Sequence, residues 1–222
     1  MPRNFTEHSA PQGTPSWLAA RTGRVTASRA KDVLATIKTG EAAARRDYRT
    51  QLVCELLTGQ PQDDTFVTAD MQRGTDLEPA ARLAYEAQTG QWVSQVGFLS
   101  HDILRAGGSP DGVIGDYDGL IEIKAPRPAN HLRYLRGFGA PKEHEAQVLH
   151  LLWLTGAQWL DFVSYCPALP AHLALCVRRC DRDESAIQDY DGKVRAFLAE
   201  VQVELESLAP VGTALAASLE VA

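Results

Sequence analysis

The chain has 222 residues, of which 45% are hydrophobic and 23% are charged, values typical of one compact globular domain. No apolar run approaches the roughly 18 residues that a membrane-spanning helix needs, and the polar start lacks the apolar core of a signal peptide. The net charge of −6 does not exclude nucleic-acid binding, because the Lys and Arg residues gather around positions 21–31, 45–49 and 124–136, which predicts a basic groove on an acidic body.

Three parts of the chain differ in composition. Residues 1–15 contain three prolines and few apolar residues, which indicates a flexible lead-in. Residues 16–208 carry the apolar patterns of helices and strands and are expected to form a single domain. The small residues of 209–222 indicate a C-terminal tail. Four cysteines, with none in a C-x-x-C pair, suit a protein of the reducing cytoplasm.

The first helices of this domain border a candidate anion site. We expect a helix at Trp17–Thr22 and a second at Arg29–Ile37, which Thr26 or Ser28 caps. The N–H groups at the start of the second helix, with Arg21 close by, would attract an anion. The same residues also fit two capped core helices with surface arginines, and the pattern alone does not separate the two interpretations.

A long helix is expected at Ala69–Thr89, after a shorter one at Glu41–Leu57. Glu78 lies directly before Pro79, so the helix is expected to start or kink there. An acid at the N-terminal side of a helix suits the helix dipole. Glu78 is also in a position from which it could reach a metal ion.

The remaining apolar patterns alternate between strands and helices, which predicts an α/β fold with a central mixed sheet flanked by helices. Strands are expected at Trp92–Leu99, Ile103–Ala106, Trp159–Cys166 and Leu173–Arg178, and helices at Ala129–Gly137, Lys142–Thr155 and Ser185–Leu208.

The stretch from Ser109 to Lys124 is the most informative part of the chain. Its second half alternates apolar residues with Glu122 and Lys124, so these two side chains share one face of a strand. Asp111 lies ten or so residues earlier, across a glycine-rich turn, which predicts a hairpin that brings it beside Glu122. Two carboxylates and a lysine on an otherwise apolar strand are costly to bury unless they are paired or bind something.

These residue types suit a hard divalent cation. Asp111, Glu122 and the carbonyl of Ile123 would supply oxygen ligands for Mg²⁺, with Mn²⁺ as an alternative ion. Such an ion activates water and offsets charge on a scissile phosphate, and Lys124 would orient or deprotonate that water. The plain alternative is a surface hairpin with an ordinary Glu–Lys pair. The pattern P-D-x(n)-E-x-K resembles that of the PD-(D/E)xK nucleases, which have a restriction-endonuclease-like core.

The resemblance extends over five motifs in order. The chain is similar to the phage lambda exonuclease and YqaJ-like viral recombinase family in the following segments: Trp17 with Arg21-x-Gly23-x-Val25-Thr26-Ala27-Ser28, Arg73-Gly74-x-x-x-Glu78 with Ala81-Arg82, Ser109-Pro110-Asp111-Gly112, Glu122-Ile123-Lys124-x-Pro126, and Ala146-Gln147-Val148. The resemblance implies a Mg²⁺-dependent exonuclease that degrades one strand of duplex DNA from its 5′ end and leaves 3′ single-stranded overhangs. It also implies a ring-shaped homotrimer that works beside a single-strand annealing protein in phage recombination, in the cytoplasm of the host.

The resemblance also implies residue roles. Asp111, Glu122 and the Ile123 carbonyl would be metal ligands, Lys124 the base that positions water, and Glu78 and Gln147 supporting catalytic residues. A pocket for the 5′-terminal phosphate would be formed by Arg21, Ser28 and Ser109. The chain departs from the family pattern in two places. Asn130 stands where a basic residue serves the phosphate pocket, although Arg127, His131 and Arg133 are near it in sequence, and His150 replaces a tyrosine.

Two other functions fit parts of the sequence. The cysteines 54, 166, 176 and 180 superficially suggest an iron–sulfur nuclease, but the spacing C-x(9)-C-x(3)-C favours free thiols. Another endonuclease of the PD-(D/E)xK type would share the hairpin. A catalytically silent DNA-end-binding protein would not need Asp111, Glu122 and Lys124 intact. His101, His144 and His150 have no partner at metal-ligand spacing and are expected to be packing or solvated residues.

Overall fold

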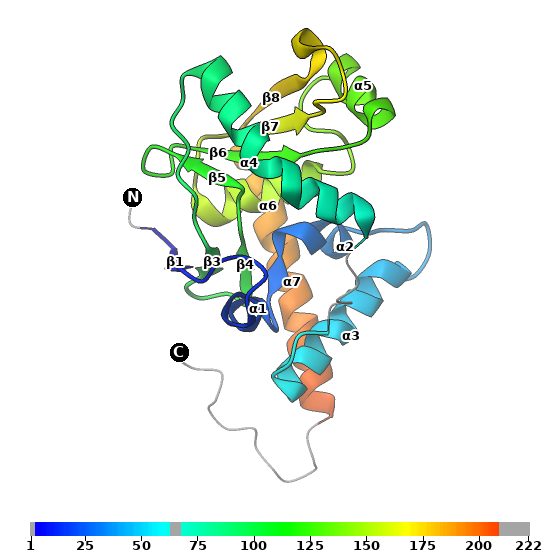
Figure 1. The fold of residues 1–222 in the computed structure, drawn as a ribbon. Helices are drawn as coiled ribbons and strands as arrows, with labels where there is room; N and C mark the ends of the chain where they lie inside the picture. The colour runs from blue at the N-terminus through cyan, green and yellow to red at the C-terminus, as the bar shows by residue number, and fades with distance from the viewer. Residues whose placement is uncertain (1–2, 63–67, 209–222) are drawn as a thin grey trace.

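The computed structural model describes residues 3–62 and 68–208, and in them two four-stranded sheets with helices around them (Figure 1). The strands are β1 (Phe5–His8), β2 (Val25–Thr26), β3 (Phe98–His101), β4 (Ala106–Gly108), β5 (Gly112–Ile114), β6 (Gly119–Lys124), β7 (Trp159–Tyr165) and β8 (Leu175–Asp181). The helices are α1 (Pro15–Arg21), α2 (Ala30–Val33), α3 (Ala43–Thr58), α4 (Ala69–Thr89), α5 (Pro128–Arg136), α6 (Glu145–Thr155) and α7 (Glu184–Ser207), with 3₁₀ turns η1 (Ala27–Arg29) and η2 (Ala171–Leu173).

Both sheets mix parallel and antiparallel pairs, which confirms the mixed α/β architecture expected from the sequence. In the first sheet, of order β1-β3-β4-β2, β2 runs parallel to β4 and the other pairs are antiparallel. In the second, of order β5-β6-β7-β8, only β6 and β7 are parallel. The chain passes from β4 in the first sheet to β5 in the second through Ser109–Asp111. The predicted motif therefore joins the two sheets.

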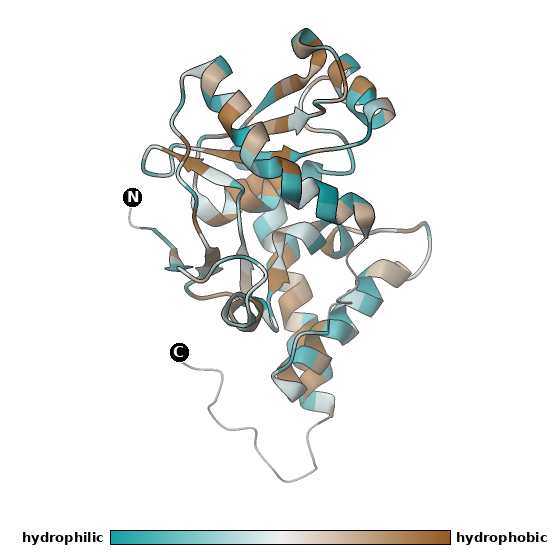
Figure 2. Cartoon of the chain, viewed as in Figure 1, coloured by the Kyte–Doolittle hydropathy of each residue, from teal (hydrophilic) through white to brown (hydrophobic). Residues whose placement is uncertain are grey.

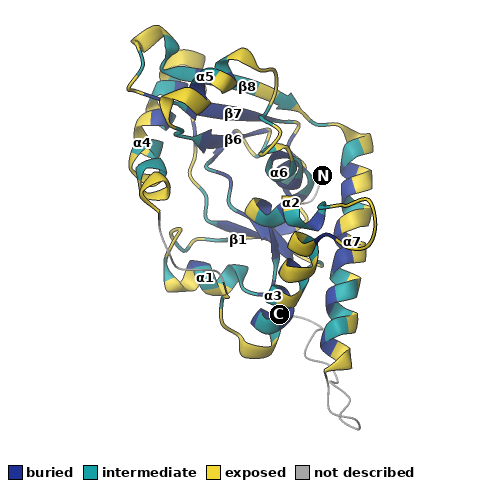
Figure 3. Ribbon diagram, turned by 90° about the vertical axis from the view of Figure 1, so that its right-hand side faces the viewer, coloured by how far each residue is buried: buried dark blue, intermediate teal, exposed yellow. Residues whose placement is uncertain are grey.

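The second sheet is packed between α4 and α6. Ile121 of β6 shares a core cluster with Tyr85 of α4, whereas the neighbouring Leu120 clusters with Leu151 of α6. Consecutive residues of a strand point to opposite faces, so β6 is buried on both sides. The middle strands β6 and β7 are buried along most of their length (Figure 3), and most of their residues are hydrophobic (Figure 2). Each such aliphatic side chain stabilises the fold by roughly 1.5–3 kcal/mol.

A buried polar cluster anchors α4 to this sheet. The carboxylate of Asp161 on β7 is buried and accepts a hydrogen bond from the hydroxyl of Tyr85 at 2.7 Å. Arg179 of β8 donates to both oxygens of the same carboxylate from Nε and Nη2, each at 2.9 Å. A forked arginine contact of this kind holds a carboxylate in a definite orientation. Because Tyr85 lies two turns after Glu78, the cluster also places Glu78 relative to the sheet.

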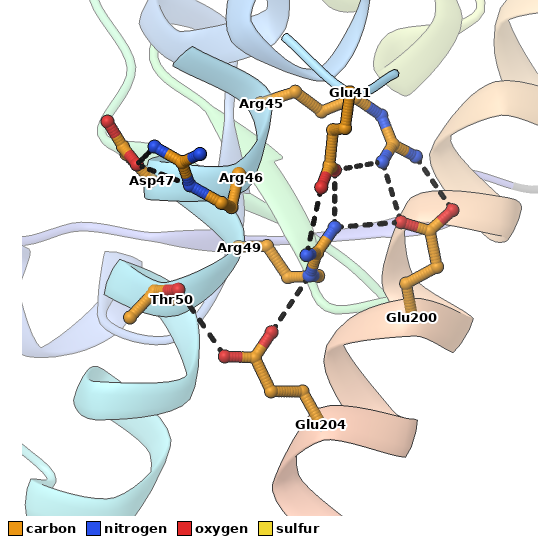
Figure 4. Close-up of polar contacts among 8 residues, drawn as sticks. All are labelled: Glu41, Arg45, Arg46, Asp47, Arg49, Thr50, Glu200 and Glu204. Carbon is orange, nitrogen blue, oxygen red and sulfur yellow. Dashed lines mark hydrogen bonds and ion pairs between the residues drawn. The ribbon is translucent and has the colours of Figure 1, made fainter. Parts of the chain in front are cut away.

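A second ionic cluster joins α3 to α7 (Figure 4). Arg45 donates to both oxygens of Glu200 at 2.6 and 2.8 Å and to Glu41 at 2.7 Å. Arg49 contacts the same Glu41 and donates to Glu204 at 2.8 Å. The charges of these arginines are thus offset by acids of the described structure. This ionic cluster holds α3 against α7, and its arginines do not contribute to the basic groove predicted from the sequence.

The lead-in differs from its expectation. Residues 5–8, predicted to be part of a flexible segment, form β1 and pair antiparallel with β3. The reason is Phe5, which is buried against Leu99 and Leu154 and so ties the segment to the first sheet. Residues 1–2 and the predicted tail 209–222 lie outside the described residues.

Pro79 lies in the interior of helix α4. The helix begins at Ala69, where the side chain of Thr68 accepts a hydrogen bond from Met71 N at 3.1 Å, and it runs on through Pro79 to Thr89. The predicted range Ala69–Thr89 is therefore confirmed, whereas the alternative of a helix start at Pro79 is wrong. An interior proline costs a helix about 3 kcal/mol, so the packing of α4 on the sheet outweighs this local cost.

The second N-terminal helix is shorter than predicted. It ends at Val33, follows a 3₁₀ turn, and is capped by neither Thr26 nor Ser28, whose hydroxyls instead lie 3.4 Å apart. The backbone N–H of Thr26 donates to the buried hydroxyl of Tyr48 at 3.0 Å, which holds this residue at the end of β2. A four-residue helix without a side-chain cap does not form the anion site predicted for its N-terminus.

The predicted strands before the hairpin are also displaced. Of the predicted strand Trp92–Leu99, only Phe98 and Leu99 lie in a regular strand, β3, and Ser94 forms an isolated bridge to Val113. Of the predicted strand Ile103–Ala106, only Ala106 lies in β4. The other expected elements are present with boundaries within a few residues. No helix in the described ranges is long and apolar enough to cross a membrane.

The histidines expected to be packing residues are confirmed as such. His101 stacks on Trp153 with ring centroids 5.3 Å apart, and His144 stacks on Phe162 at 5.3 Å. His150 is fully buried in α6, where its Nδ1 lies 2.7 Å from the hydroxyl of Tyr190 and its Nε2 lies 3.0 Å from the carbonyl of Gly107. This arrangement fits a neutral ring that donates from Nε2 and accepts at Nδ1, and it ties α6 to both β4 and α7.

His150 should make the stability of the fold depend on pH. Burial lowers the pKa of His150 to about 4, below the value of about 6.5 in an unfolded chain. Between these two pH values the unfolded chain binds a proton at His150 and the folded chain does not. The contribution of the neutral His150 to the free energy of unfolding is therefore fully present above about pH 6.5 and is lost as the pH falls toward 4. The lost stability is on the order of 3 kcal/mol.

Urea unfolding of the wild type and of His150→Gln at pH 7 and pH 4.5 measures this effect. The free energy of unfolding should fall between these pH values by less in the variant than in the wild type. Equal falls would mean that His150 does not titrate in this way.

Candidate active site

The hairpin of β5 and β6 brings the two predicted carboxylates together. Gly112 pairs with Ile121, and Asp111 N donates to the Ile121 carbonyl at 3.1 Å, so Asp111 lies opposite Glu122. The Asp111 carboxylate also accepts a hydrogen bond from Ile123 N at 2.6 Å through Oδ2. Asp111 is thus held by backbone contacts on both sides. Its pKa is raised by burial, although Lys124 and the Ile123 N–H partly oppose this shift.

Glu122 is the most constrained acid of the site. Its side chain is buried, and its Oε1 accepts hydrogen bonds from Lys124 Nζ at 2.5 Å and from Gln147 Nε2 at 2.6 Å. Its second oxygen, Oε2, is buried with no hydrogen-bond partner among the described residues. Burial, and then the neighbouring charge of Asp111, raise the pKa of Glu122 to about 7. An unpartnered, buried carboxylate oxygen beside a second carboxylate is a favourable ligand for a cation.

Lys124 points from the same face of β6 as Glu122. Burial lowers the pKa of Lys124, but the carboxylates of Glu122 and Asp111 outweigh it, so that the pKa is raised. The side chain is therefore an ammonium group while both carboxylates are charged. It balances one of the two negative charges, which leaves the site with a residual negative charge.

Glu78 reaches the site from α4, on the other side of the sheet. Burial and the charge of Asp111 raise the pKa of Glu78, and Arg82 partly offsets this. Arg82 lies one turn after Glu78, donates to its carboxylate at 2.5 Å and lies 3.4 Å from the Asp111 carbonyl. The sequence analysis included Arg82 only as part of a motif. Its spacing of four residues from Glu78, which places both on one helix face, is the signal that could have identified it.

These residues fit a divalent cation held by few protein side chains. The described residues contain no group of three or more His, Cys, Asp or Glu side chains arranged to hold a metal ion. The donor set is instead two carboxylates, Asp111 and Glu122, with the Ile123 carbonyl on the same strand. The free Oε2 of Glu122 supports this assignment. Mg²⁺ commonly keeps several water or phosphate ligands beside one or two carboxylates, so a set of this size is sufficient.

A second group of predicted residues lies at the edge of the first sheet. Strands β2 and β4 are parallel, with Thr26 paired to Gly107, so Ser28 and Ser109, each two residues after this pair, lie at the same edge. Ser109 Oγ accepts a hydrogen bond from Trp17 Nε1 at 3.1 Å, and the guanidinium of Arg21 lies 4.6 Å from the Trp17 ring centroid. Trp17 thus links Arg21 to Ser109, a contact that the sequence analysis did not identify.

The basic residues near Asn130 are used in other ways. His131 is buried, with Nδ1 2.7 Å from Ser164 Oγ and Nε2 2.8 Å from the Leu173 carbonyl, so it is not available to a phosphate. Arg127 forms an ion pair with Asp70, and Arg133 forms one with Glu143. Asn130 itself is exposed on α5.

The cysteines do not form a cluster. All four are free thiols, in agreement with the expectation from their spacing. Cys54 lies on α3, whereas Cys166, Cys176 and Cys180 lie on or beside the strands β7 and β8 of the second sheet. The arrangement gives no support to an iron–sulfur centre.

Comparison with known proteins shows which family and fold the chain resembles. The model of the YqaJ-like viral recombinase domain matches residues 16–158. Two crystal structures of an alkaline exonuclease from Laribacter hongkongensis, one of them in complex with dAMP, are 41% identical to the chain over 88% of its length and 96% of theirs, with TM-scores of 0.79 and 0.80.

A phage-related exonuclease from Haemophilus somnus is 12% identical over 84% of the chain and 96% of that protein, with a TM-score of 0.67, which is a likeness of fold alone. No curated protein matches the chain. These likenesses confirm the PD-(D/E)xK fold class predicted from the sequence.

The raised pKa of Glu122 predicts how a cation should bind. A ligand must be deprotonated, so the apparent affinity for Mn²⁺ should rise with pH up to about 7 and level off above it. Glu122→Gln should weaken binding by at least about tenfold at pH 8, because it removes the charged ligand while preserving its shape. Titration calorimetry with Mn²⁺ measures both effects. Glu206→Gln, on the exposed face of α7, is the matched control. Unchanged affinity in the Glu122 variant would contradict the assigned site.

Proposed function

The chain belongs to the YqaJ-like viral recombinase family, and from this premise we propose that it is a metal-dependent exonuclease that degrades one strand of linear double-stranded DNA from the 5′ end. The product is a duplex with 3′ single-stranded overhangs, the substrate for annealing in phage recombination. The observation that carries the proposal is the buried Glu122, with one oxygen free, beside Asp111, Lys124 and Gln147. A binding protein without catalysis has no use for this costly arrangement.

The proposed catalytic centre follows from the contacts. Asp111, Glu122 and the Ile123 carbonyl hold Mg²⁺, or Mn²⁺ as an alternative, which when bound activates water and offsets charge on the scissile phosphate. Gln147 holds the Glu122 carboxylate in place through its amide. Lys124 orients the attacking water. Its Nζ, which donates to the Glu122 carboxylate, would also help to deprotonate that water.

Two further groups complete the proposed site. Glu78, held by Arg82, would add a further carboxylate near Asp111 and so support the metal site. Arg21, Ser28 and Ser109 form the receptor for a 5′-terminal phosphate. Support for this receptor comes from the shared sheet edge and from Trp17, which contacts both Arg21 and Ser109. The tripeptide Ser109–Asp111 connects the receptor directly to the metal site.

We propose the remaining features of the family for this chain as well. The nuclease acts as one domain over residues 16–208, with β1 attached to it, and assembles as a homotrimeric ring around DNA. Its partner is a single-strand annealing protein. The free cysteines suit the reducing bacterial cytoplasm in which it would act.

The test of the function uses linear duplex DNA labelled at either the 5′ or the 3′ end, beside a closed circle. With Mg²⁺ the wild type should release the 5′ label first and leave the circle intact. Lys124→Ala should lower the rate by well over tenfold and leave DNA-end binding largely unchanged, because Lys124 acts in the chemistry rather than in folding. Release of the 3′ label first, cutting of the circle, or a variant within about tenfold of the wild type would overturn the proposal.

Arg21 should set a preference for 5′-phosphorylated ends. A terminal phosphate carries more negative charge than an internal diester and has a free end that fits the receptor. The wild type should therefore degrade 5′-phosphate ends faster than 5′-hydroxyl ends. Loss of a charge-assisted contact costs on the order of 1.5–3 kcal/mol, so Arg21→Ala should reduce this preference by roughly tenfold to a hundredfold.

Initial rates on both kinds of end, for both proteins, measure the Arg21 effect. Digestion of 5′-hydroxyl ends should be spared in the variant. A wild type with no end preference, or a variant equally impaired on both substrates, would show that Arg21 does not receive the 5′-phosphate.

A further inference from the structure

The loop between α5 and α6 exposes an aromatic ring. Phe138 stands between Gly137 and Gly139 and is 98% exposed, more than the other large hydrophobic residues of the described structure. Gly137 N donates to the Tyr134 carbonyl at the end of α5, and Gly139 has a φ of +63°, so the chain turns sharply on both sides of the ring. Single exposed apolar residues are common on protein surfaces. What distinguishes Phe138 is its position in the fold and the charges around it.

This loop leads directly into the active site. It ends at His144, and three residues later Gln147 donates to Glu122. The ring of His144 stacks on Phe162, and after burial the charge of Lys124 is the strongest influence that lowers its pKa. The base of the loop is therefore within electrostatic reach of the catalytic lysine. Six residues of chain span at most roughly 20 Å, so Phe138 lies no farther than this from His144 at the base of the loop.

The charges around the ring favour nucleic acid. The segment from Arg133 to His144 contains three cations and one acid. The acid, Glu143, is paired with Arg133. Within the described ranges, Arg136 and Lys142 form no ion pair with an acid. Two uncommitted cations flank an exposed aromatic ring, the combination with which proteins bind single-stranded nucleic acid without sequence preference.

We propose that Phe138 stacks on a nucleobase of the DNA bound at the active site, while Arg136 and Lys142 contact the flanking phosphates. This inference rests on the proposed nuclease function. Stacking suits an exonuclease, because every base offers an aromatic face and the enzyme must accept any sequence. The two glycines allow the ring to adjust to successive bases.

The test compares DNA binding by the wild type, Phe138→Ala and Phe138→Trp, with Ca²⁺ in place of Mg²⁺ to suppress hydrolysis. Trp92→Ala is the matched control, because Trp92 is also exposed, at 81%, but lies in the segment before β3. Phe138→Ala should weaken binding by roughly fivefold to a hundredfold, whereas the other two variants should bind like the wild type. All three variants should keep the thermal stability of the wild type, since the ring packs on nothing.

Abasic DNA separates stacking from an indirect effect of the loop. Abasic sites are placed singly along the strand near the end. At one position the missing base should weaken binding by the wild type about as much as Phe138→Ala does on intact DNA, and it should have no further effect on that variant. Equal affinity of the wild type and Phe138→Ala, or additive losses at every abasic position, would overturn the inference.

Three further outcomes separate this inference from the proposed function. If Phe138→Ala changes the sedimentation of the protein without DNA, the ring belongs to an interface between copies of the chain and the inference is wrong. If the wild type itself neither binds nor digests DNA, the proposed function fails with it. If the wild type does both and Phe138→Ala is indistinguishable from it, only the stacking contact is rejected.

Discussion

Burial of the Glu122 carboxylate is the constraint on which the rest of the site depends. The residue lies on a strand that is covered by helices on both faces, where a charge without partners costs several kcal/mol. Lys124 and Gln147 satisfy one oxygen and leave the other free. Asp111 lies opposite and adds a second negative charge. Without a cation, two charged carboxylates in this buried position are unfavourable, and for this reason the pKa values of Asp111 and Glu122 are raised.

Buried polar contacts away from this centre keep its parts in register. The cluster of Tyr85, Asp161 and Arg179 fixes α4, and hence Glu78, against the sheet. His150 ties α6, and hence Gln147, to β4 and to α7. Side chains that bind a metal or substrate need support of this kind, because small displacements of a ligand weaken binding. The supporting polar groups therefore lie where they hold α4 and α6, the helices that carry Glu78 and Gln147.

The meeting of the two sheets connects recognition with chemistry. Ser28 and Ser109 follow the paired ends of β2 and β4 in the first sheet. From Ser109 the chain continues through Pro110 to Asp111, which directly precedes β5 of the second sheet. In the proposed function, the receptor for the DNA end and the centre that hydrolyses it are thus attached to one short segment. The exposed Phe138, on the loop that enters α6, adds a third contact on the side of Gln147.

Local spacing along the chain is enough to predict the hairpin, the α/β class and the family. Alternation places Glu122 and Lys124 on one face, glycines permit the turn, and the five motifs occur in order. The sequence analysis also named Asp111, Gln147 and Ser109, which the structure places within these contacts.

Tertiary packing sets which polar groups have hydrogen-bond or ionic partners and which have none among the described residues. The predicted cap of the second helix is absent, Pro79 lies inside a helix, and Phe5 draws the lead-in into a sheet. Arg45 and His131 are occupied by partners far away in sequence. The roles of Arg82 and Trp17 and the free oxygen of Glu122 likewise depend on contacts between distant segments. Local spacing does not encode such contacts, because they arise when separate elements pack and compete for the same donors and acceptors.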